Sequence, residues 1–236
     1  MPRVYPLLMG LLGPDSLPED PEERAQQKAD TPGIVFYIEG VSELIMVDAG
    51  LGDTKLIEKK YSWKAVREPG RTLRESLTKF GLKPEDVETV IITHLHWDHM
   101  GEAEEFRNAI FIVQERELEA ASVAGDPAIS GYDPWTFERL DCNTVNGDAR
   151  IAKDIRVVFT PGHTVGHQSV VVTTGKGRVV VAGDAVFTYG QWEENLPAPF
   201  SVDEEQSLKS LYRLKRIADV IIPSHDMRVL GREYYP

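Results

Sequence analysis

The stretch THLHWDHMG, residues 93–101, concentrates side chains that can bind a metal ion. It holds three of the six histidines of the chain and one aspartate, which are His94, His96, Asp98 and His99. Imidazole nitrogens and carboxylate oxygens are ligands that zinc accepts. Because a catalytic zinc ion uses about three protein ligands and keeps one position open, this stretch offers more ligands than a single ion needs.

Three further metal-capable residues follow apolar, β-branched runs elsewhere in the chain. The runs IRVVFTPGH and RVVVAGD end in His163 and Asp184, and ADVIIPSHD carries His225 near its end. VETVIITH, which ends in His94, has the same pattern. Each run predicts a buried strand that delivers a polar side chain where the chain leaves the sheet, and catalytic groups are commonly held at such places. Seven candidate ligands are too many for one tetrahedral ion and suit two ions that share a bridging carboxylate.

The segments between these runs predict the elements that hold them. MPRVYPLLMGLLG predicts an early strand rather than a signal peptide, because Pro6 interrupts the apolar run and no small-residue cleavage site follows. Residues 13–33 are rich in proline and acidic residues and predict a long surface loop. IVFYIEG and LIMVDAG predict two strands joined by a tight turn near Gly40. AIFIV predicts a strand, and ERELEAASVAG predicts the helix that follows it.

Two further helices have recognisable starting signals. TLRESLTKFG predicts a helix that begins with a capping box of Thr72 and Glu75 and ends at Gly81. SVDEEQSLKSLYRLKRIAD predicts an amphipathic helix that begins with a capping box of Ser201 and Glu204. Since strands and helices are mixed without an intervening linker, we predict one α/β domain over residues 1–236.

Composition limits the classes of partner. The formal charge is −12, which is a poor match for the phosphate backbone of a nucleic acid. No apolar run approaches the roughly 20 residues of a membrane-spanning helix. The single cysteine excludes an intrachain disulfide and fits a reducing compartment. We therefore expect a soluble, cytoplasmic protein with no nucleic-acid or membrane partner. The sequence leaves the oligomeric state open, with a homodimer as one possibility.

The ordered motifs HLHWDH, TPGHTVGHQS, AGDAVF and PSHD resemble those of the metallo-β-lactamase-fold hydrolases, and the resemblance runs from about Phe36 to His225. It implies a four-layer αβ/βα sandwich with the site at one edge of the two sheets. It also implies a first ion held by His94, His96 and His163. The second ion would be held by Asp98, His99 and His225. Asp184 would bridge the two ions.

The resemblance and the chemistry of such ions together predict further roles. Two ions about 3.5–4 Å apart can hold a hydroxide near neutral pH, and one of them can polarise a carbonyl or phosphoryl oxygen. Asp98 would lie beside both nucleophile and leaving group, which predicts a proton shuttle. Asp48 resembles the family's aspartate that hydrogen-bonds a metal-binding histidine. We expect two divalent ions, with zinc expected and iron, manganese or cobalt also compatible with these ligands. We interpret Trp97 as a packing residue and His167 as a structural hydrogen-bonding residue.

Within this group, the chain is most similar to N-acyl homoserine lactonases and related lactonases. The similarity lies in four segments, which are THLHWDHMGE, TPGHTVGHQS, GDAVFT and PSHDMRVL. This similarity implies hydrolysis of a small-molecule ester or lactone by a metal-bridging hydroxide. The lactonases usually carry a tyrosine three residues after the bridging aspartate, whereas this chain has Phe187, which cannot donate a hydrogen bond from its ring. Phe187, Tyr189 and Trp192 are the candidate substrate contacts. Segments 13–33, 125–137 around Trp135, and 187–200 are the candidate pocket loops.

Two alternative activities remain open from the sequence. The first is a mononuclear iron sulfur dioxygenase that resembles persulfide dioxygenases, which keep a similar histidine motif. The second is a metal-dependent phosphodiesterase, which the acidic charge disfavours. A flavodiiron enzyme is disfavoured because that group has a glutamate where this chain has His96. Glyoxalase II is disfavoured because only eleven residues follow His225 (236 − 225 = 11).

Overall fold

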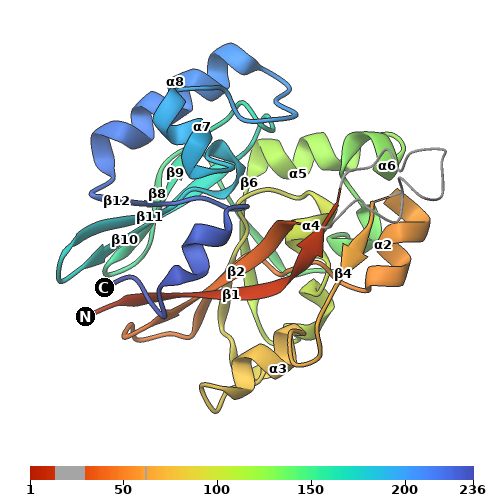
Figure 1. Ribbon diagram of the computed structural model, residues 1–236, viewed down its shortest axis with the longest axis horizontal. Helices are drawn as coiled ribbons and strands as arrows, with labels where there is room; N and C mark the ends of the chain where they lie inside the picture. The colour runs from red at the N-terminus through yellow and green to blue at the C-terminus, as the bar shows by residue number, and fades with distance from the viewer. Residues whose placement is uncertain (14–29, 62) are drawn as a thin grey trace.

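The computed structural model describes residues 1–13, 30–61 and 63–236. Two β-sheets face each other, and helices cover the outer face of each sheet (Figure 1). This arrangement is the four-layer αβ/βα sandwich that the sequence predicted, within an α/β class. Most of the loop predicted over residues 13–33, which was also a candidate pocket segment, lies outside the described residues.

The two sheets differ in size and in strand order. The larger sheet has the order β4 (Ala65–Val66), β1 (Arg3–Leu12), β2 (Thr31–Glu39), β3 (Ile45–Val47), β5 (Thr89–Ile91), β6 (Ile110–Gln114) and β7 (Cys142–Val145). The smaller sheet has the order β12 (Val220–Ile222), β11 (Gly177–Val181), β10 (Gln168–Thr174), β9 (Ile155–Phe159) and β8 (Ala149–Ala152). Each predicted strand is present, although β2 and β3 are joined by residues 40–44 rather than by a tight turn.

Strand direction brings the candidate ligands to one edge of each sheet. In the larger sheet β3, β5, β6 and β7 are parallel. In the smaller sheet β9 and β11 both run antiparallel to β10, and β12 is parallel to β11. The carboxyl ends of β9, β11 and β12 therefore share one edge, where His163, Asp184 and His225 follow.

The apolar strands are covered on both faces, which explains their continuous β-branched character. In β11, Val179 and Val181 point into the core between the sheets, and Val180 points to the outer core beneath α8 (Glu204–Ile217). All three valines are at most 1% exposed. Burial of each such side chain stabilises the fold by roughly 1.5–3 kcal/mol. A third cluster lies under the helices of the larger sheet.

The remaining helices lie on the outer faces or close the ends of the sheets. Figure 1 shows α7 and α8 on the outer side of the smaller sheet and α3 on the opposite side of the molecule. The α-helices other than α8 are α2 (Thr54–Tyr61), α3 (Leu73–Thr78), α4 (Trp97–Met100), α5 (Glu115–Ser122), α6 (Pro127–Ser130) and α7 (Tyr189–Glu194). Short 3-10 helices are η1 (Pro84–Asp86), η2 (Ala103–Glu105), η3 (Pro134–Thr136), η4 (Gly183–Ala185) and η5 (Met227–Gly231).

The two predicted capping boxes have different outcomes. The box of Thr72 and Glu75 is confirmed at the start of α3, with both reciprocal hydrogen bonds present. The box of Ser201 and Glu204 is wrong, because the N-cap of α8 is Asp203, two residues after Ser201. The Asp203 carboxylate accepts the backbone N–H of Gln206 at 2.9 Å. The Ser201 hydroxyl instead donates to the Ala198 carbonyl at 2.7 Å, because the chain turns back there.

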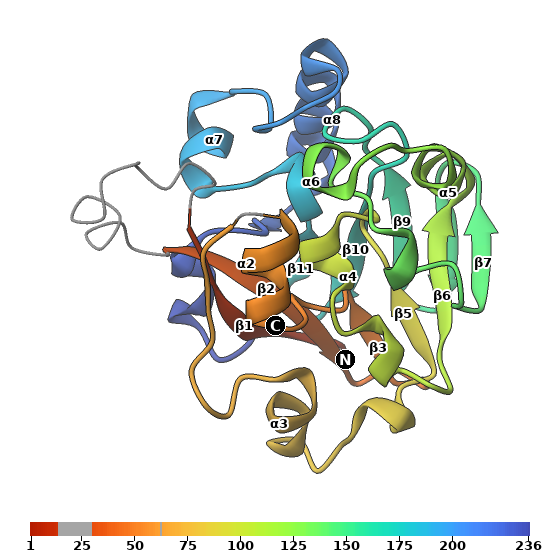
Figure 2. The same ribbon diagram turned by 90° about the vertical axis from the view of Figure 1, so that its right-hand side faces the viewer.

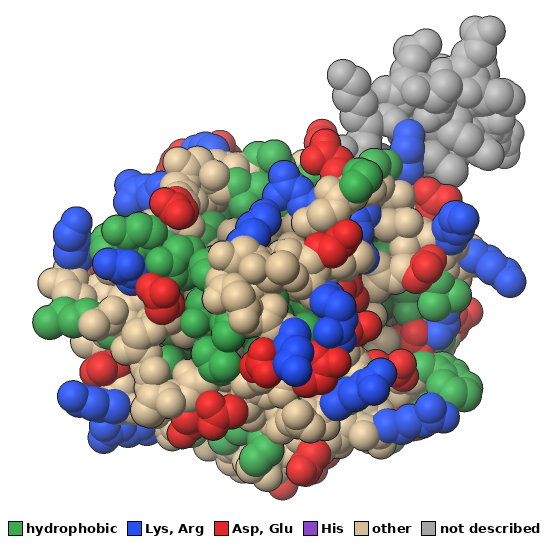
Figure 3. Space-filling model, turned by 90° about the horizontal axis from the view of Figure 1, so that it is seen from below, with side chains coloured by type: hydrophobic (Ala, Val, Ile, Leu, Met, Phe, Trp, Pro, Cys, Tyr) green, Lys and Arg blue, Asp and Glu red, His purple; other side chains and the backbone are tan. Residues whose placement is uncertain are grey.

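Two surface observations bear on the expected partners. Among the described residues, no helix is both long enough and apolar enough to cross a membrane. On the face shown in Figure 3, basic and acidic side chains are interspersed, so this face offers no continuous basic surface for a nucleic acid.

Candidate metal centre

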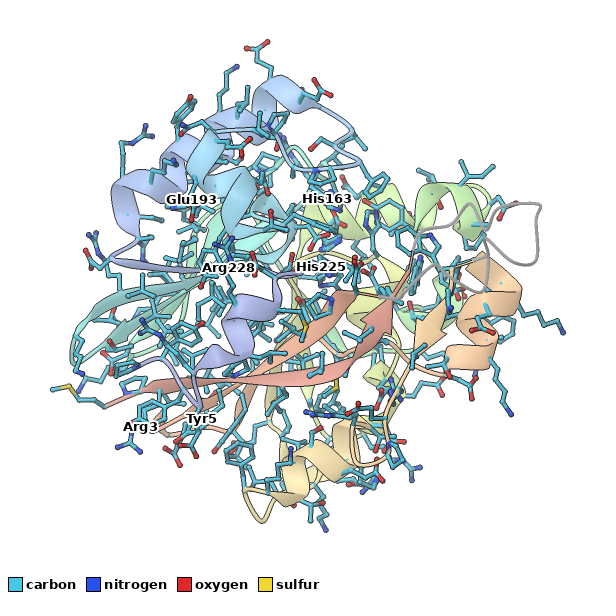
Figure 4. All side chains as sticks on the ribbon, viewed as in Figure 1. Arg3, Tyr5, His163, Glu193, His225 and Arg228 are labelled. Atoms are coloured by element: carbon cyan, nitrogen blue, oxygen red, sulfur yellow. The ribbon has the colours of Figure 1, made fainter. Side chains whose placement is uncertain are left out.

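The seven candidate ligands come together between the two sheets. His94, His96, Asp98 and His99 follow β5 of the larger sheet, whereas His163, Asp184 and His225 follow β9, β11 and β12 of the smaller sheet. Figure 4 labels His163 and His225, which lie near the middle of the molecule where the sheets meet. Groups that are far apart in the sequence thus form one cluster.

The first ligand group consists of three histidines. The Nε2 atoms of His94 and His163 lie 3.0 and 3.1 Å from Nδ1 of His96. Their ligand atoms all lie within 4.8 Å of one another, a spacing that could hold one metal ion. The second group consists of Asp98, His99 and His225, and it meets the same criterion. In this group Asp98 Oδ2 lies 3.7 Å from Nε2 of each histidine.

Asp184 stands between these two groups and presents one oxygen to each. Its Oδ2 lies 3.4 Å from His163 Nε2 and 4.0 Å from His94 Nε2. Its Oδ1 lies 3.1 Å from His99 Nε2 and 3.2 Å from His225 Nε2. A carboxylate in this position can bridge two cations.

Four of the five histidines of the cluster make a hydrogen bond through Nδ1, the ring nitrogen that faces away from the cluster. His163 Nδ1 and His225 Nδ1 each lie 2.9 Å from a backbone carbonyl, those of Pro199 and Pro32. A carbonyl can only accept, so each ring carries a proton on Nδ1 and turns its Nε2 toward the cluster. This outer hydrogen bonding is the usual device for orienting a metal-binding histidine.

Asp48 and Thr93 hold the other two rings. His99 Nδ1 donates to Asp48 Oδ2 at 2.8 Å, and the Thr93 hydroxyl donates to the same oxygen at 2.9 Å. Because the Thr93 proton is used in this way, its oxygen accepts from His94 Nδ1 at 3.1 Å. Thr93 N also donates to Asp48 Oδ1 at 2.7 Å, so both carboxylate oxygens of Asp48 are engaged.

The electrostatics of the cluster favour a cation. Burial lowers the pKa of His94 and of His96 well below the usual histidine range, so both rings are neutral and able to bind a metal. For His99, burial opposes protonation, but the carboxylates of Asp184 and Asp98 outweigh it and hold the pKa well above its usual value. This second half of the cluster thus attracts positive charge.

Three buried atoms at the second group make no well-aligned hydrogen bond, although two of them, both nitrogens, lie 3.1 and 3.2 Å from the third, an oxygen. They are Nε2 of His99, Nε2 of His225 and Oδ1 of Asp184. Unpaired buried polar atoms are costly and rare in proteins, so several at one place call for an explanation. The donor set, the protonated Nδ1 atoms on the outer side and these poorly satisfied inner atoms fit two divalent cations.

Gly101, at the end of the motif, allows the loop that follows β3 to pack closely against it. A Cβ atom on Gly101 would lie 2.1 Å from the carbonyl carbon of Leu51. The Gly101 N–H donates to the Gly50 carbonyl at 2.7 Å, and Ala49 N–H donates to the His99 carbonyl at 2.7 Å. These contacts keep Asp48 at the distance from His99 that their hydrogen bond needs.

The candidate substrate contacts do not all lie at the cluster. The Phe187 ring packs on the His225 ring, with 4.2 Å between ring centroids. The Tyr189 hydroxyl instead bonds the Ile221 carbonyl at 3.3 Å. Trp192 packs in the outer core of the smaller sheet, with the Lys215 ammonium over its ring. The structure therefore brings only Phe187 next to the candidate ligands, because α7 begins at Tyr189 and turns the next side chains away.

Two other interpreted residues behave as the sequence suggested. Trp97 is buried and stacks on Tyr61 at 4.6 Å between centroids. His167 is fully buried, and its Nδ1 pairs with the Thr160 hydroxyl at 2.9 Å. Burial lowers the pKa of His167 to about 3, so this ring is neutral.

Sequence reasoning missed the residues that support the cluster from behind. Glu117 on α5 accepts hydrogen bonds from both ligand-bearing loops. Gly131 lies against the His96 ring, and its carbonyl accepts the Trp97 N–H at 2.9 Å. Spacing gives no signal for Gly131 or for the Pro32 and Pro199 carbonyls. The acidic Glu117 near the start of a helix was visible but resembles an ordinary exposed helix residue.

Comparison with known proteins shows the family to which this fold and cluster belong. A sequence profile of the Metallo-beta-lactamase superfamily matches residues 30–225. An N-acyl homoserine lactonase of Bacillus cereus is 33% identical over 156 residues, which are 64% of this chain and 60% of that protein. An N-acyl homoserine lactonase of a Bacillus species is 30% identical over 200 residues, which are 83% of this chain and 77% of that protein. The chain thus matches less than two thirds of the first relative and more than two thirds of the second.

Two solved structures share the fold. One is an N-acyl homoserine lactone hydrolase with the product N-hexanoyl-L-homoserine bound at the catalytic metal center. Its TM-score is 0.82 at 24% identity, covering 99% of this chain and 98% of that one. The other is AidC, a dizinc quorum-quenching lactonase in complex with a product. Its TM-score is 0.68 at 17% identity, covering 96% of this chain and 88% of that one.

Proposed function

Because the chain belongs to the metallo-beta-lactamase superfamily, we propose that it is a metal-dependent hydrolase that opens a lactone ring or cleaves a related ester. The observation that carries the proposal is the convergence of two ligand groups on the two oxygens of Asp184. The N-acyl homoserine lactonase relatives support a lactone as the substrate class.

We assign the first ion to His94, His96 and His163 and the second to Asp98, His99 and His225, with Asp184 shared. When bound, two such ions supply an activated water and polarise the carbonyl of the substrate. Asp48 orients the His99 ring through its 2.8 Å contact. Asp98 holds and moves a proton between the attacking water and the departing ring oxygen, because its carboxylate is the acidic group of the cluster that reaches toward solvent.

A partly apolar cavity supports a substrate with an apolar part. A cavity of about 330 Å³ lies beside Trp97, the residue before Asp98. Its walls include the side chains of Leu56, Ile57 and Tyr61 from α2, and Trp135 from the predicted pocket segment 125–137. The charged residues Asp53, Lys60, Glu104 and Asp133 line the rest of the cavity, and cavities that combine apolar walls with a few polar groups suit small organic ligands. An acyl group attached to the lactone ring fits this chemistry.

The metal and the cellular site belong to the same proposal. Neutral imidazoles and carboxylates bind zinc well, and iron, manganese and cobalt also accept such ligands. We assign zinc as the working metal, with the dizinc lactonase AidC as support. The single cysteine fits a cytoplasmic enzyme that needs no disulfide.

The test is a substrate panel on protein prepared without metal and then reloaded with zinc. The panel holds N-acyl homoserine lactones of short and long chain, simple lactones, an aryl ester, bis(p-nitrophenyl) phosphate, and a persulfide with oxygen uptake as the readout. We expect lactone opening that disappears after chelation and returns with zinc. Zinc-replete protein that opens no lactone and cleaves no ester would contradict the proposal. Faster turnover of the phosphate diester or of the persulfide would replace it with one of the alternatives.

A further inference from the structure

A buried carboxylate lies behind the three-histidine group and is not one of its ligands. Glu117 is the third residue of α5, and it is fully buried at 0% exposure. Figure 2 shows α5 at the end of the larger sheet toward which the arrow of β6 points, which is the end that carries the candidate ligands. A charged side chain is seldom fully buried unless it makes specific interactions.

The Glu117 carboxylate accepts hydrogen bonds from two loops that are far apart in the sequence. Oε1 accepts the Leu95 N–H at 3.0 Å, and Leu95 stands between His94 and His96. Oε2 accepts the Thr164 hydroxyl at 2.7 Å and the Gly166 N–H at 3.0 Å, and Thr164 follows His163 directly. One side chain therefore connects both segments that supply the three histidines.

A third segment reaches the same carboxylate. The Tyr132 ring lies against the His96 ring with 5.0 Å between centroids, and burial and the nearby Glu117 carboxylate raise the pKa of its hydroxyl. Gly166 packs so closely on α5 that a Cβ atom there would lie 2.2 Å from the Glu117 nitrogen. The position of Glu117 in the first turn of α5 further favours a negative charge.

We propose that Glu117 is a positioning residue for the three-histidine group. Its carboxylate fixes the distance between the segment of His94 and His96 and the loop of His163, so that their three nitrogens converge on one ion. The contacts of Asp98, His99 and His225 do not pass through Glu117. This inference rests on the proposed function for the presence of two ions, and it predicts that the two ions depend on Glu117 to different degrees.

Replacement of Glu117 by glutamine would break the hydrogen-bonded connection between the two loops while keeping the shape of the side chain. Glutamine has a single carbonyl oxygen, whereas Leu95 donates to one carboxylate oxygen and Thr164 and Gly166 donate to the other. One of the two loops must therefore face an amide N–H in place of an acceptor. Outer hydrogen-bond partners of metal ligands typically contribute 10–100-fold to metal affinity.

The experiment measures cobalt affinity, by absorption and chelator competition, at each group separately. Variant His225→Ala leaves the three-histidine group intact, and variant His163→Ala leaves the Asp98, His99 and His225 group intact. We expect Glu117→Gln to weaken cobalt binding about 10–100-fold in the His225→Ala background and less than about 3-fold in the His163→Ala background. Glu119→Gln, an exposed residue of the same helix, is the matched control and should change neither affinity.

Two outcomes would overturn the inference. Equal losses at both groups would mean that Glu117 only stabilises the fold, and unchanged affinity at the three-histidine group would mean that it does not position the ligands. If Glu117→Gln does not fold, Thr164→Val decides, because it removes one buried donor at nearly constant shape and should weaken only the three-histidine group. Failure of the parent protein to bind two ions would instead contradict the proposed function.

Discussion

Asp98 is distinguished from the other carboxylate of the cluster by its access to solvent. Its side chain is 16% exposed, whereas that of Asp184 is 4% exposed. A group that exchanges protons with an incoming substrate must reach the space that the substrate enters, while a bridging carboxylate need not. This difference in exposure supports the separate roles assigned to the two aspartates.

Replacing Asp98 by asparagine tests the proton-transfer role. We expect kcat for lactone opening to fall about 100- to 10,000-fold in zinc-replete protein, because an amide cannot accept the proton. Elemental analysis of the assayed sample establishes that it still holds zinc. Asp141→Asn, the same change at an exposed aspartate just before β7 and outside the proposed cavity, should leave kcat unchanged. Normal turnover of zinc-replete Asp98→Asn protein would remove Asp98 from the mechanism.

For single residues, the sequence predicted which residue types form the cluster better than it predicted where each side chain points. The seven candidate ligands could be selected because histidine and aspartate recur at strand ends, and the structure brings them together. Whether Tyr189 and Trp192 faced the site could not be decided, because one helical turn in α7 redirects both side chains. Every residue has a backbone carbonyl, so the sequence does not indicate that those of Pro32 and Pro199 accept hydrogen bonds from His225 and His163.

The element that most closely supports the smaller sheet's part of the site is α8. The Ser210 hydroxyl donates to the Pro161 carbonyl at 2.6 Å, and Ser207 accepts the Ala198 N–H at 2.8 Å. Asp203 N–H donates to the Gly162 carbonyl, next to His163. The first turns of α8 therefore fix the His163 loop, and the start of this helix matters to the site.

Two substitutions by alanine distinguish the two helix starts that the sequence allows. We expect Asp203→Ala to lower the free energy of unfolding by about 1 kcal/mol, because it removes the N-cap acceptor of α8. Ser201→Ala should lower it by less than about 0.5 kcal/mol, since its hydroxyl makes only a local bond to Ala198. Urea unfolding at neutral pH measures both values. A larger loss for Ser201→Ala than for Asp203→Ala would contradict the observed helix start.

Both candidate starts match the same short pattern, so spacing alone could not choose between them. Ser201 and Glu204 form one pair three residues apart, and Asp203 and Gln206 form another. The choice depends on long-range contacts, since Val202 and Asp203 donate backbone N–H groups to the His163 and Gly162 carbonyls. In contrast, α3 has no competing pair, and its capping box was predicted correctly.

For the whole molecule, the candidate site depends on the docking of the two sheets. The larger sheet supplies His94, His96, Asp98 and His99, and the smaller sheet supplies the other three ligands. Buried runs that alternate with helices predicted the layered fold, because apolar strands covered on both faces require helices outside and a second sheet inside. The pairing of a particular edge of one sheet with an edge of the other came from the family resemblance, since local patterns carry no such information.

The central claim is that these two edges hold two metal ions around Asp184. Crystals of the zinc-loaded protein, measured at the zinc absorption edge, test it directly. We predict two anomalous peaks per chain on either side of Asp184. One should be bound by His94, His96 and His163, and the other by Asp98, His99 and His225. A single peak, or peaks at other residues while these seven side chains remain free, would contradict the account.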